Sequence, residues 1–103
     1  MTDDSRLLHD DVPFSTVIDM LVNAPGARAR RASWPSGWCL VAVPGSEITV
    51  SADRPLGAAL PYLVGEIVAY APHIDLYRPD TGQLSAWVPG QSDLFAHDWT
   101  VNR

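Results

Sequence analysis

Only one stretch of this chain carries the hydrophobic spacing of a long helix, which limits the folds open to it. The apolar residues of that stretch recur at i, i+3, i+4 and i+7, on one helical face: Phe14, Val17, Ile18 and Leu21. Pro13 suits a first helical turn, and Pro25-Gly26 ends the element. We therefore expect a helix over about residues 13–23.

The rest of the chain is cut into short strand-forming runs by its prolines and glycines. Runs rich in strand formers lie at residues 27–31, 38–43, 48–50, 67–70, 74–78, 84–88 and 99–101. Pro79-Asp80-Thr81-Gly82 predicts the clearest hairpin turn. Residues 54–61 are expected to form a loop, and Ser92 to cap a short helical turn through Ala96. The predicted class is α+β, with one N-terminal helix packed on a mainly antiparallel β-sheet of short strands.

A length of 103 residues is that of one domain. We expect a flexible N-terminal arm over residues 1–12, because this part is polar and acidic, and a single domain over residues 13–103. No apolar run approaches the ~20 residues that a bilayer span needs, so no membrane partner is expected. Cys39 is the single cysteine, which is typical of a reducing, cytoplasmic setting.

The charge of the chain bears on its partners. A net charge of −5 is a poor match for DNA or RNA, so no nucleic acid polymer is expected as a partner. A small phosphorylated ligand is compatible with it, because Arg28, Arg30 and Arg31 form a local basic cluster. A nucleotide needs a pocket of roughly 300 Å³ or more, and a chain this small must supply it as a surface cleft or between subunits.

The segment Arg30-Arg31-Ala32-Ser33-Trp34-Pro35 holds the first candidate site. Trp34 lies in a proline-bounded loop, where its ring is able to stack on a nucleobase for ~1–3 kcal/mol. The alternative, which residue type alone favours, is a loop tryptophan that closes the edge of the core. Arginines bind phosphates through paired hydrogen bonds or form surface ion pairs. If the segment is extended, Arg31 and Ser33 share a face and Arg30 points elsewhere.

His73-Ile74-Asp75 places an imidazole and a carboxylate on one side of an extended segment. His97-Asp98 adds a second histidine and aspartate, but as neighbours their side chains would diverge. Such a pair serves as a general base or as half of a metal site. No third ligand stands at a metal-binding spacing, and no phosphate loop or nucleophile motif is present. We therefore predict no catalytic residue, no metal and no cofactor, with these residues holding hydrogen bonds at a fold corner.

Six motifs in order resemble the Thoeris anti-defence 2 family of phages and prophages, from about Phe14 to Val101. They are the helix at Phe14, Arg30 to Pro35, Val43-Pro44-Gly45-Ser46, Pro72-His73-Ile74-Asp75, Trp87-Val88-Pro89, and Ser92 to Trp99. The resemblance implies a non-enzymatic protein that binds a cyclic nucleotide messenger, glycocyclic ADP-ribose, and holds it unmodified. It also implies a homo-oligomer, a homotetramer in the family, with pockets at subunit interfaces, in the cytoplasm of an infected or lysogenic host. Some members also hold cyclic dinucleotides of CBASS systems in separate sites.

The resemblance carries seven ligand-binding positions onto this chain: Arg31, Ser33, Trp34, Pro35, His73, Asp75 and Asp98. It implies that Trp34 stacks on the adenine, Ser33 forms a hydrogen bond and Arg31 meets the pyrophosphate. It also implies that the His73, Asp75 and Asp98 side chains contact ribose hydroxyls or brace the pocket. The loop 51–60 and the N-terminal arm depart from the family pattern, so the messenger isomer and a separate dinucleotide site stay open.

Two other functions are compatible with the residues. One is a small phosphodiesterase or lyase that uses His73 and Asp75 to cleave the same class of messenger. The other is a phage structural or interaction module without a small ligand. An enzyme would cleave the messenger, whereas a sequestering protein would leave it intact. An interaction module would show no increase in thermal stability with any nucleotide.

Overall fold

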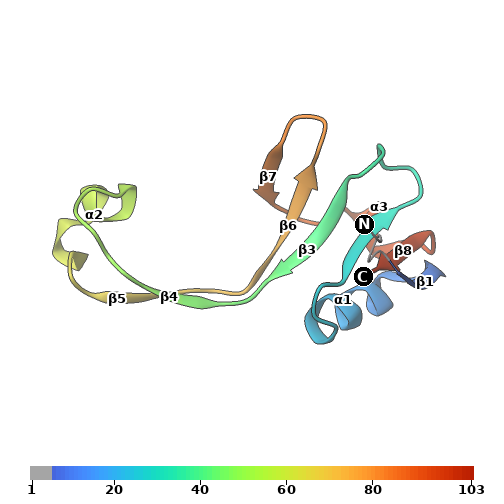
Figure 1. Ribbon diagram of the computed structural model, residues 1–103, viewed down its shortest axis with the longest axis horizontal. Coiled ribbons are helices and arrows are strands. Elements are labelled where there is room, and N and C mark those ends of the chain that lie inside the picture. Colours follow the sequence, from blue (N-terminus) through green and yellow to red (C-terminus); the bar gives the residue numbers. More distant parts are fainter. Residues whose placement is uncertain (1–5) are drawn as a thin grey trace, which may run out of the picture. The chain divides into compact units, whose positions relative to one another are not determined.

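The computed structural model describes residues 6–103, which divide into two units (Figure 1). The first unit comprises residues 6–43 and 74–103, and the second comprises Pro44–His73. In chain order the elements are β1 (Leu7–Val12), α1 (Phe14–Asn23), β2 (Arg28–Arg31), β3 (Cys39–Val43), β4 (Ser46–Thr49), α2 (Pro55–Ala59), the 3-10 helix η1 (Pro61–Leu63), β5 (Ile67–Tyr70), β6 (His73–Arg78), β7 (Gln83–Ala86), α3 (Gln91–Phe95) and β8 (Trp99–Asn102).

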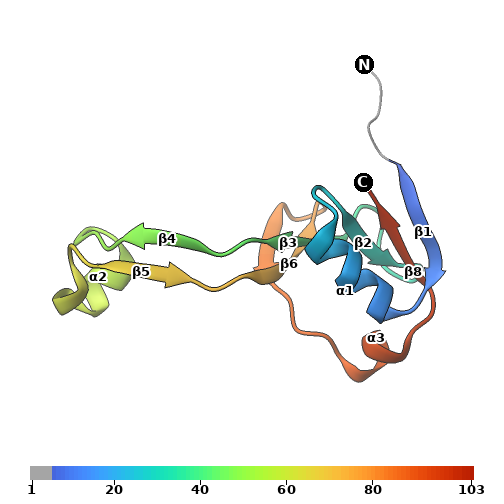
Figure 2. The same cartoon turned by 90° about the horizontal axis from the view of Figure 1, so that it is seen from below.

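A six-stranded sheet in the order β1-β8-β2-β3-β6-β7 forms the first unit. The last strand in the sequence, β8, lies between β1 and β2 and pairs antiparallel with both (Figure 2). The predicted hairpin is present, with β6 and β7 paired antiparallel from Asp75↔Ala86 to Arg78↔Gln83. The predicted α+β class, with an N-terminal helix on a mainly antiparallel sheet, is therefore confirmed.

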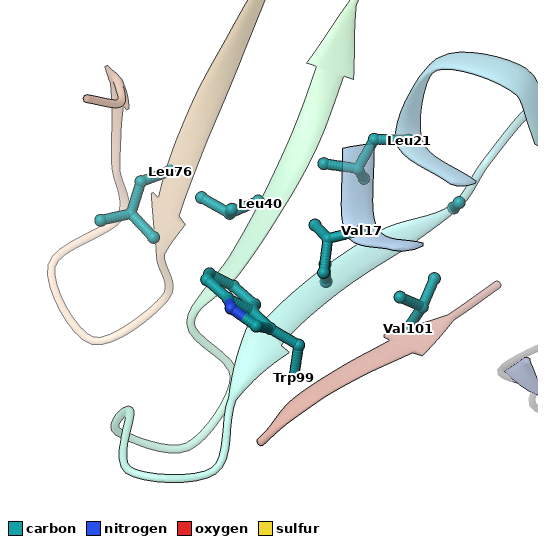
Figure 3. Packing of buried hydrophobic residues seen from close by; sticks show 8 residues of the cluster. Val17, Leu21, Leu40, Leu76, Trp99 and Val101 are labelled. Atoms are coloured by element: carbon teal, nitrogen blue, oxygen red, sulfur yellow. The ribbon is translucent and has the colours of Figure 1, made fainter. Parts of the chain in front are cut away.

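Helix α1 covers one face of this sheet and supplies part of its core (Figure 3). Val17 and Leu21 lie on the side of α1 that packs against β2, β3 and β8. Their exposed fractions are 0% and 5%. They meet Leu40, Trp99 and Val101, which are equally buried. Residues at i and i+4 lie on one helical face, which is why this spacing in the sequence predicted the helix.

Strand alternation separates the two faces of the sheet. Ala29 pairs with Leu40 on one side and with Val101 on the other, and all three are buried against α1. Because successive strand residues point to opposite faces, the flanking Arg28 and Arg30 lie on the face away from α1. Arg31 returns to the α1 face, opposite Trp99 of β8.

The expected flexible arm over residues 1–12 falls partly outside the described residues. Within them, Leu7–Val12 is strand β1, paired with β8 at Leu7↔Asn102 and Val12↔Trp99, so that part of the expectation is wrong. Pairing with β8 satisfies backbone groups of this polar segment, and the Thr100 hydroxyl donates a hydrogen bond to Asp10 at 2.7 Å. A polar sequence is thus compatible with an edge strand whose partner is distant in the chain.

The second unit is a two-stranded antiparallel sheet, β4 and β5, joined by α2 and η1. The prediction of a loop over residues 54–61 is wrong, because Pro55 begins helix α2. Proline suits the first turn of a helix, where its missing N–H costs nothing. Gly57 of α2 is buried, and a β-carbon there would stand 2.0 Å from the Ser51 carbonyl oxygen. Only glycine allows the helix to lie this close to its own preceding turn.

Helix α3 begins two residues earlier than expected. Its cap is Gly90, whose N–H donates a hydrogen bond to the Asp93 carboxylate at 2.8 Å, so the prediction of Ser92 as the cap is wrong. A carboxylate in the first turn that reaches back to the cap stabilises a helix start as a serine cap does. Across residues 6–103, no helix has the length and apolarity needed to cross a membrane.

Candidate functional site

The chain turns sharply where β2 ends, at the segment predicted to carry the site. The Trp34 N–H bonds to the Arg31 carbonyl at 3.2 Å, which closes a turn over Arg31–Trp34. The segment is therefore not extended, and Arg31 and Ser33 do not share a strand face. Ser33 and Pro35 are exposed. Arg30 approaches the turn from the other face, and its Nη2 donates to the Trp34 carbonyl at 2.7 Å.

Arg31 is held by two carboxylates that lie far along the chain. Its Nε donates to Asp98 Oδ1 and its Nη1 donates to Asp93 Oδ1, each at 3.0 Å. The Arg31 and Asp93 side chains are 19% and 17% exposed, so solvent screens this pair only partly. We call the Arg31, Asp93 and Asp98 set the arginine clamp. It ties the end of β2 to α3 and to the residue before β8.

The electrostatics of the arginine clamp favour the charged guanidinium. The hydrogen bond to Asp98 is the largest effect and raises the pKa of Arg31; burial opposes it, and the hydrogen bond to Asp93 and the charges of both carboxylates add to the rise. A guanidinium has five N–H donors, and the clamp uses donors on Nε and Nη1. The two carboxylates outweigh the single cation, which gives the clamp a local negative charge.

Trp34 belongs to a cluster of aromatic rings beside the clamp. Its ring centroid lies 5.3 Å from that of Trp99 at an interplanar angle of 79°, and 6.3 Å from that of Trp87 at 71°. These edge-to-face contacts are favourable for aromatic pairs. Trp99 is fully buried, contacts Phe14 as well, and donates its indole N–H to the Asp93 carbonyl at 3.0 Å. Half-buried Trp34 thus closes the edge of the core, as the alternative interpretation proposed, and keeps part of its ring accessible.

The structure brings together three of the predicted site residues, Arg31, Trp34 and Asp98. His73 and Asp75 keep their i, i+2 spacing in β6, but their surroundings differ. Asp75 is 8% exposed, and its neighbour Leu76 joins the core, so Asp75 lies on the sheet face away from Arg31. His73 is exposed and belongs to the second unit, with its Nδ1 3.3 Å from the Ala71 carbonyl.

A pocket opens on the sheet face away from α1. Its volume is about 220 Å³, and its lining residues are Arg28, Ala29, Arg30, Gly37, Trp38, Cys39 and Asn102. Arg28 and Arg30 were predicted to form a basic cluster with Arg31, whereas no motif pointed to Trp38 or Asn102 as site residues. The sequence signal for this pocket was the order Arg28-Ala29-Arg30, because alternation along a strand places the two arginine side chains on the same face.

Cys39 is partly sheltered on this face. Partial burial raises the pKa of the Cys39 thiol, because it disfavours the thiolate. The positive charges of Arg28 and Arg30 oppose this shift and are the smaller effect. Cys39 is therefore protonated at neutral pH. Within the described part of the chain, no three His, Cys, Asp or Glu side chains gather as a metal site would require.

Together these features define a small α+β protein in which one helix, a sheet and an aromatic cluster fix a charged turn. The model of the Thoeris anti-defense 2-like domain matches residues 12–102. The chain belongs to this family, and its membership supports an anti-defence role directed at Thoeris systems. No curated protein matches the chain.

Proposed function

We propose that this protein sequesters the cyclic nucleotide messenger of a Thoeris immune system, a glycocyclic ADP-ribose, and holds it without cleaving it. The effector that responds to the messenger then stays inactive. The ligand-binding residues of the proposal are Arg31, Ser33, Trp34 and Pro35 of the turn, with Asp98 beside them. Asp75 lies on the sheet face away from Arg31 and His73 belongs to the second unit, so these two residues enter the proposal only as contacts to ribose hydroxyls or braces supplied by another copy.

The turn after β2 is the observation that carries this proposal. It presents an exposed hydroxyl at Ser33, an accessible part of the Trp34 ring and the remaining donors of Arg31 within a few residues. These are the groups that bind ribose, adenine and phosphate oxygens. The arginine clamp and the aromatic cluster hold the backbone of the turn, so binding requires little ordering of the chain.

The size and charge of the chain favour a pocket shared between copies. The pocket on the outer sheet face is about 220 Å³, below the roughly 300 Å³ that a nucleotide needs. The clamp carries two carboxylates for one guanidinium, which opposes a pyrophosphate unless a second copy adds donors or cations. A messenger held between copies is also excluded from water more completely, which strengthens each charged hydrogen bond.

The decisive experiment follows the fate of the messenger. Purified protein is incubated with glycocyclic ADP-ribose, the unbound fraction is removed, and the protein is heat-denatured. We expect the released messenger to be intact by mass spectrometry and able to activate the effector again. A cleaved product would favour the phosphodiesterase or lyase alternative, and His73→Ala would then identify its base. No retained messenger at all would contradict sequestration.

Substituting Trp34 tests the proposed stacking contact. Loss of a stacked base costs ~1–3 kcal/mol, so Trp34→Ala should weaken messenger binding roughly 5- to 150-fold in calorimetric titrations. Trp34→Phe keeps a flat ring and should lose much less. Melting curves of both variants, read by circular dichroism, separate loss of binding from loss of structure. If folded Trp34→Ala binds like the parent protein, Trp34 does not stack on the ligand.

Self-association is part of the proposal and has its own support in the second unit. A two-stranded sheet is marginal by itself, and this unit leaves large apolar side chains exposed: Tyr62 76%, Ile67 67%, Tyr70 56% and Val64 44%. Exposed apolar groups of this kind mark interaction surfaces. A homotetramer of 11.2 kDa chains is the expected species in light scattering. Ile67→Ser with Tyr62→Ser should shift it toward smaller species, and a parent protein that is monomeric at every concentration would contradict the shared pocket.

A further inference from the structure

The loop of residues 32–38 joins β2 to β3 and carries part of the proposed ligand site. All of its residues are exposed except Trp34 and Trp38, which are half-buried. Two turns shape the loop, because the Trp34 N–H donates to the Arg31 carbonyl and the Trp38 N–H donates to the Pro35 carbonyl, each at 3.2 Å. An exposed loop with few backbone hydrogen bonds opens easily, so its order depends on the side chains that anchor it.

Trp38 attaches the second turn of this loop to the hairpin of β6 and β7. Its indole N–H donates to the Asp80 carboxylate at 3.0 Å, and the Arg78 guanidinium carbon lies 4.9 Å from its ring centroid. A charged acceptor and a cation over the ring both favour this position of the indole. Arg78 is itself held by the hairpin, since its Nη1 donates to the Gln83 side-chain oxygen at 3.0 Å. We call Trp38, Arg78 and Asp80 the hairpin brace.

Gly37 allows the loop and the hairpin to lie this close together. Its φ is 82°, which glycine adopts freely, and a β-carbon there would stand 2.7 Å from the Pro79 side chain. Any other residue at this position would push the loop away from the hairpin. At the first turn, Arg30 Nη2 donates to the Trp34 carbonyl at 2.7 Å. Both turns of the loop are therefore attached to side chains outside it.

We infer that Trp38 is a positioning residue for messenger binding, which acts through the loop and not by touching the ligand. This inference rests on the proposed function. The hairpin brace orders the loop before the ligand arrives, so that binding does not have to order it. Without the brace, the entropy lost in ordering the loop would oppose binding. Trp38, Arg78 and Asp80 lie outside the six family motifs and outside the proposed ligand-binding set, so the brace adds a second group of residues that determine affinity.

Amide hydrogen exchange of the free protein, followed by mass spectrometry, tests the brace without any ligand. Trp38→Phe keeps an aromatic ring and loses the indole N–H, and Asp80→Ala removes its acceptor. Both variants should exchange several-fold faster than the parent protein in residues 32–38. Asp80→Asn keeps an oxygen acceptor and should exchange like the parent. The matched control is Leu84→Ala, which changes a side chain of the same hairpin that is 57% exposed and outside the brace. Unchanged exchange in Trp38→Phe and Asp80→Ala would overturn the brace itself.

Calorimetric titration with glycocyclic ADP-ribose then measures the effect on binding, at a temperature where circular dichroism shows every variant folded. Trp38→Phe and Asp80→Ala should each weaken binding about 3- to 10-fold. The double variant should bind about as well as either single one, because both substitutions remove the same contact. Asp80→Asn and Leu84→Ala should bind like the parent protein.

The outcomes separate the two proposals. If the parent protein binds the messenger and Trp38→Phe binds it equally well, Trp38 does not position the site, and sequestration stands. Fully additive losses in the double variant would also overturn the inference, because the two residues would then act independently. If the parent protein does not bind the messenger, the proposed function fails together with the role of Trp38 in it.

Discussion

Replacing Trp99 by alanine should destabilise the protein by about 3–5 kcal/mol, the range for removing a fully buried aromatic side chain. Trp99 is 0% exposed and its ring contacts Phe14, Trp34 and Trp87. Its indole N–H also satisfies the Asp93 carbonyl. Since small domains are stable by only about 5–15 kcal/mol, this loss should lower the melting temperature by tens of degrees or prevent folding.

Two further variants make the Trp99 prediction specific. Trp99→Phe keeps a buried ring and loses the hydrogen bond to Asp93, so its loss should be clearly smaller than that of alanine. Val88→Ala removes an apolar side chain that is 84% exposed and should be almost neutral. Urea unfolding followed by circular dichroism compares the free energies of unfolding. A Trp99→Ala protein as stable as Val88→Ala would show that the aromatic cluster does not hold the first unit together.

Replacing Arg31 by glutamine should cost about 2 kcal/mol, intermediate between an exposed and a buried ion pair. The Asp93 and Asp98 side chains are 17% and 34% exposed, so the substitution leaves two partly shielded carboxylates facing each other without a cation. For a domain of this size, such a loss lowers the melting temperature by about 10 °C. Thermal unfolding followed by circular dichroism measures the shift.

The control for Arg31 is Arg54→Gln, which removes the same charge from an exposed position in the second unit. Adding Asp98→Asn to Arg31→Gln should recover part of the loss, because it removes one of the two repelling charges. If Arg31→Gln melts like Arg54→Gln, the clamp contributes no stability. Arg31→Gln also separates two roles, since a phosphate contact predicts weaker messenger binding at temperatures where the variant is fully folded.

The clamp and the cluster meet at Asp93, which gives the two predictions a common consequence for function. Its side chain bonds to Arg31 and to the Gly90 N–H, and its carbonyl bonds to Trp99. The turn that carries Ser33 and Trp34 is thus held in place by the contacts of Asp93, which is not itself one of the proposed ligand-binding residues. Substitutions of Asp93 or Trp99 are expected to change binding through the position of this turn, and substitutions of Arg31 or Trp34 also through the proposed direct contacts.

Local patterns in the sequence were sufficient for the elements and the class. The spacing of Phe14, Val17 and Leu21 predicted α1, and Pro79-Asp80-Thr81-Gly82 predicted the hairpin of β6 and β7. The local predictions failed at Ser92, at residues 54–61 and at β1. In each place a partner that the local pattern does not reveal decided the outcome: the Asp93 carboxylate, the Ser51 turn and strand β8.

By itself, the sequence determined the α+β class, the helix, most of the strands and the family. These depend on periodicity and on ordered motifs, which are properties of neighbouring residues. Only the tertiary structure decided what Arg31 does and which arginines share a pocket. Arg31 meets Asp93 and Asp98 from 62 and 67 residues away, because β8 returns to pair with β2. Alternation within β2 sets Arg31 on one face and Arg28 with Arg30 on the other, whereas the pairing with β8 brings Arg31 to its two carboxylates, and no local pattern contains that pairing.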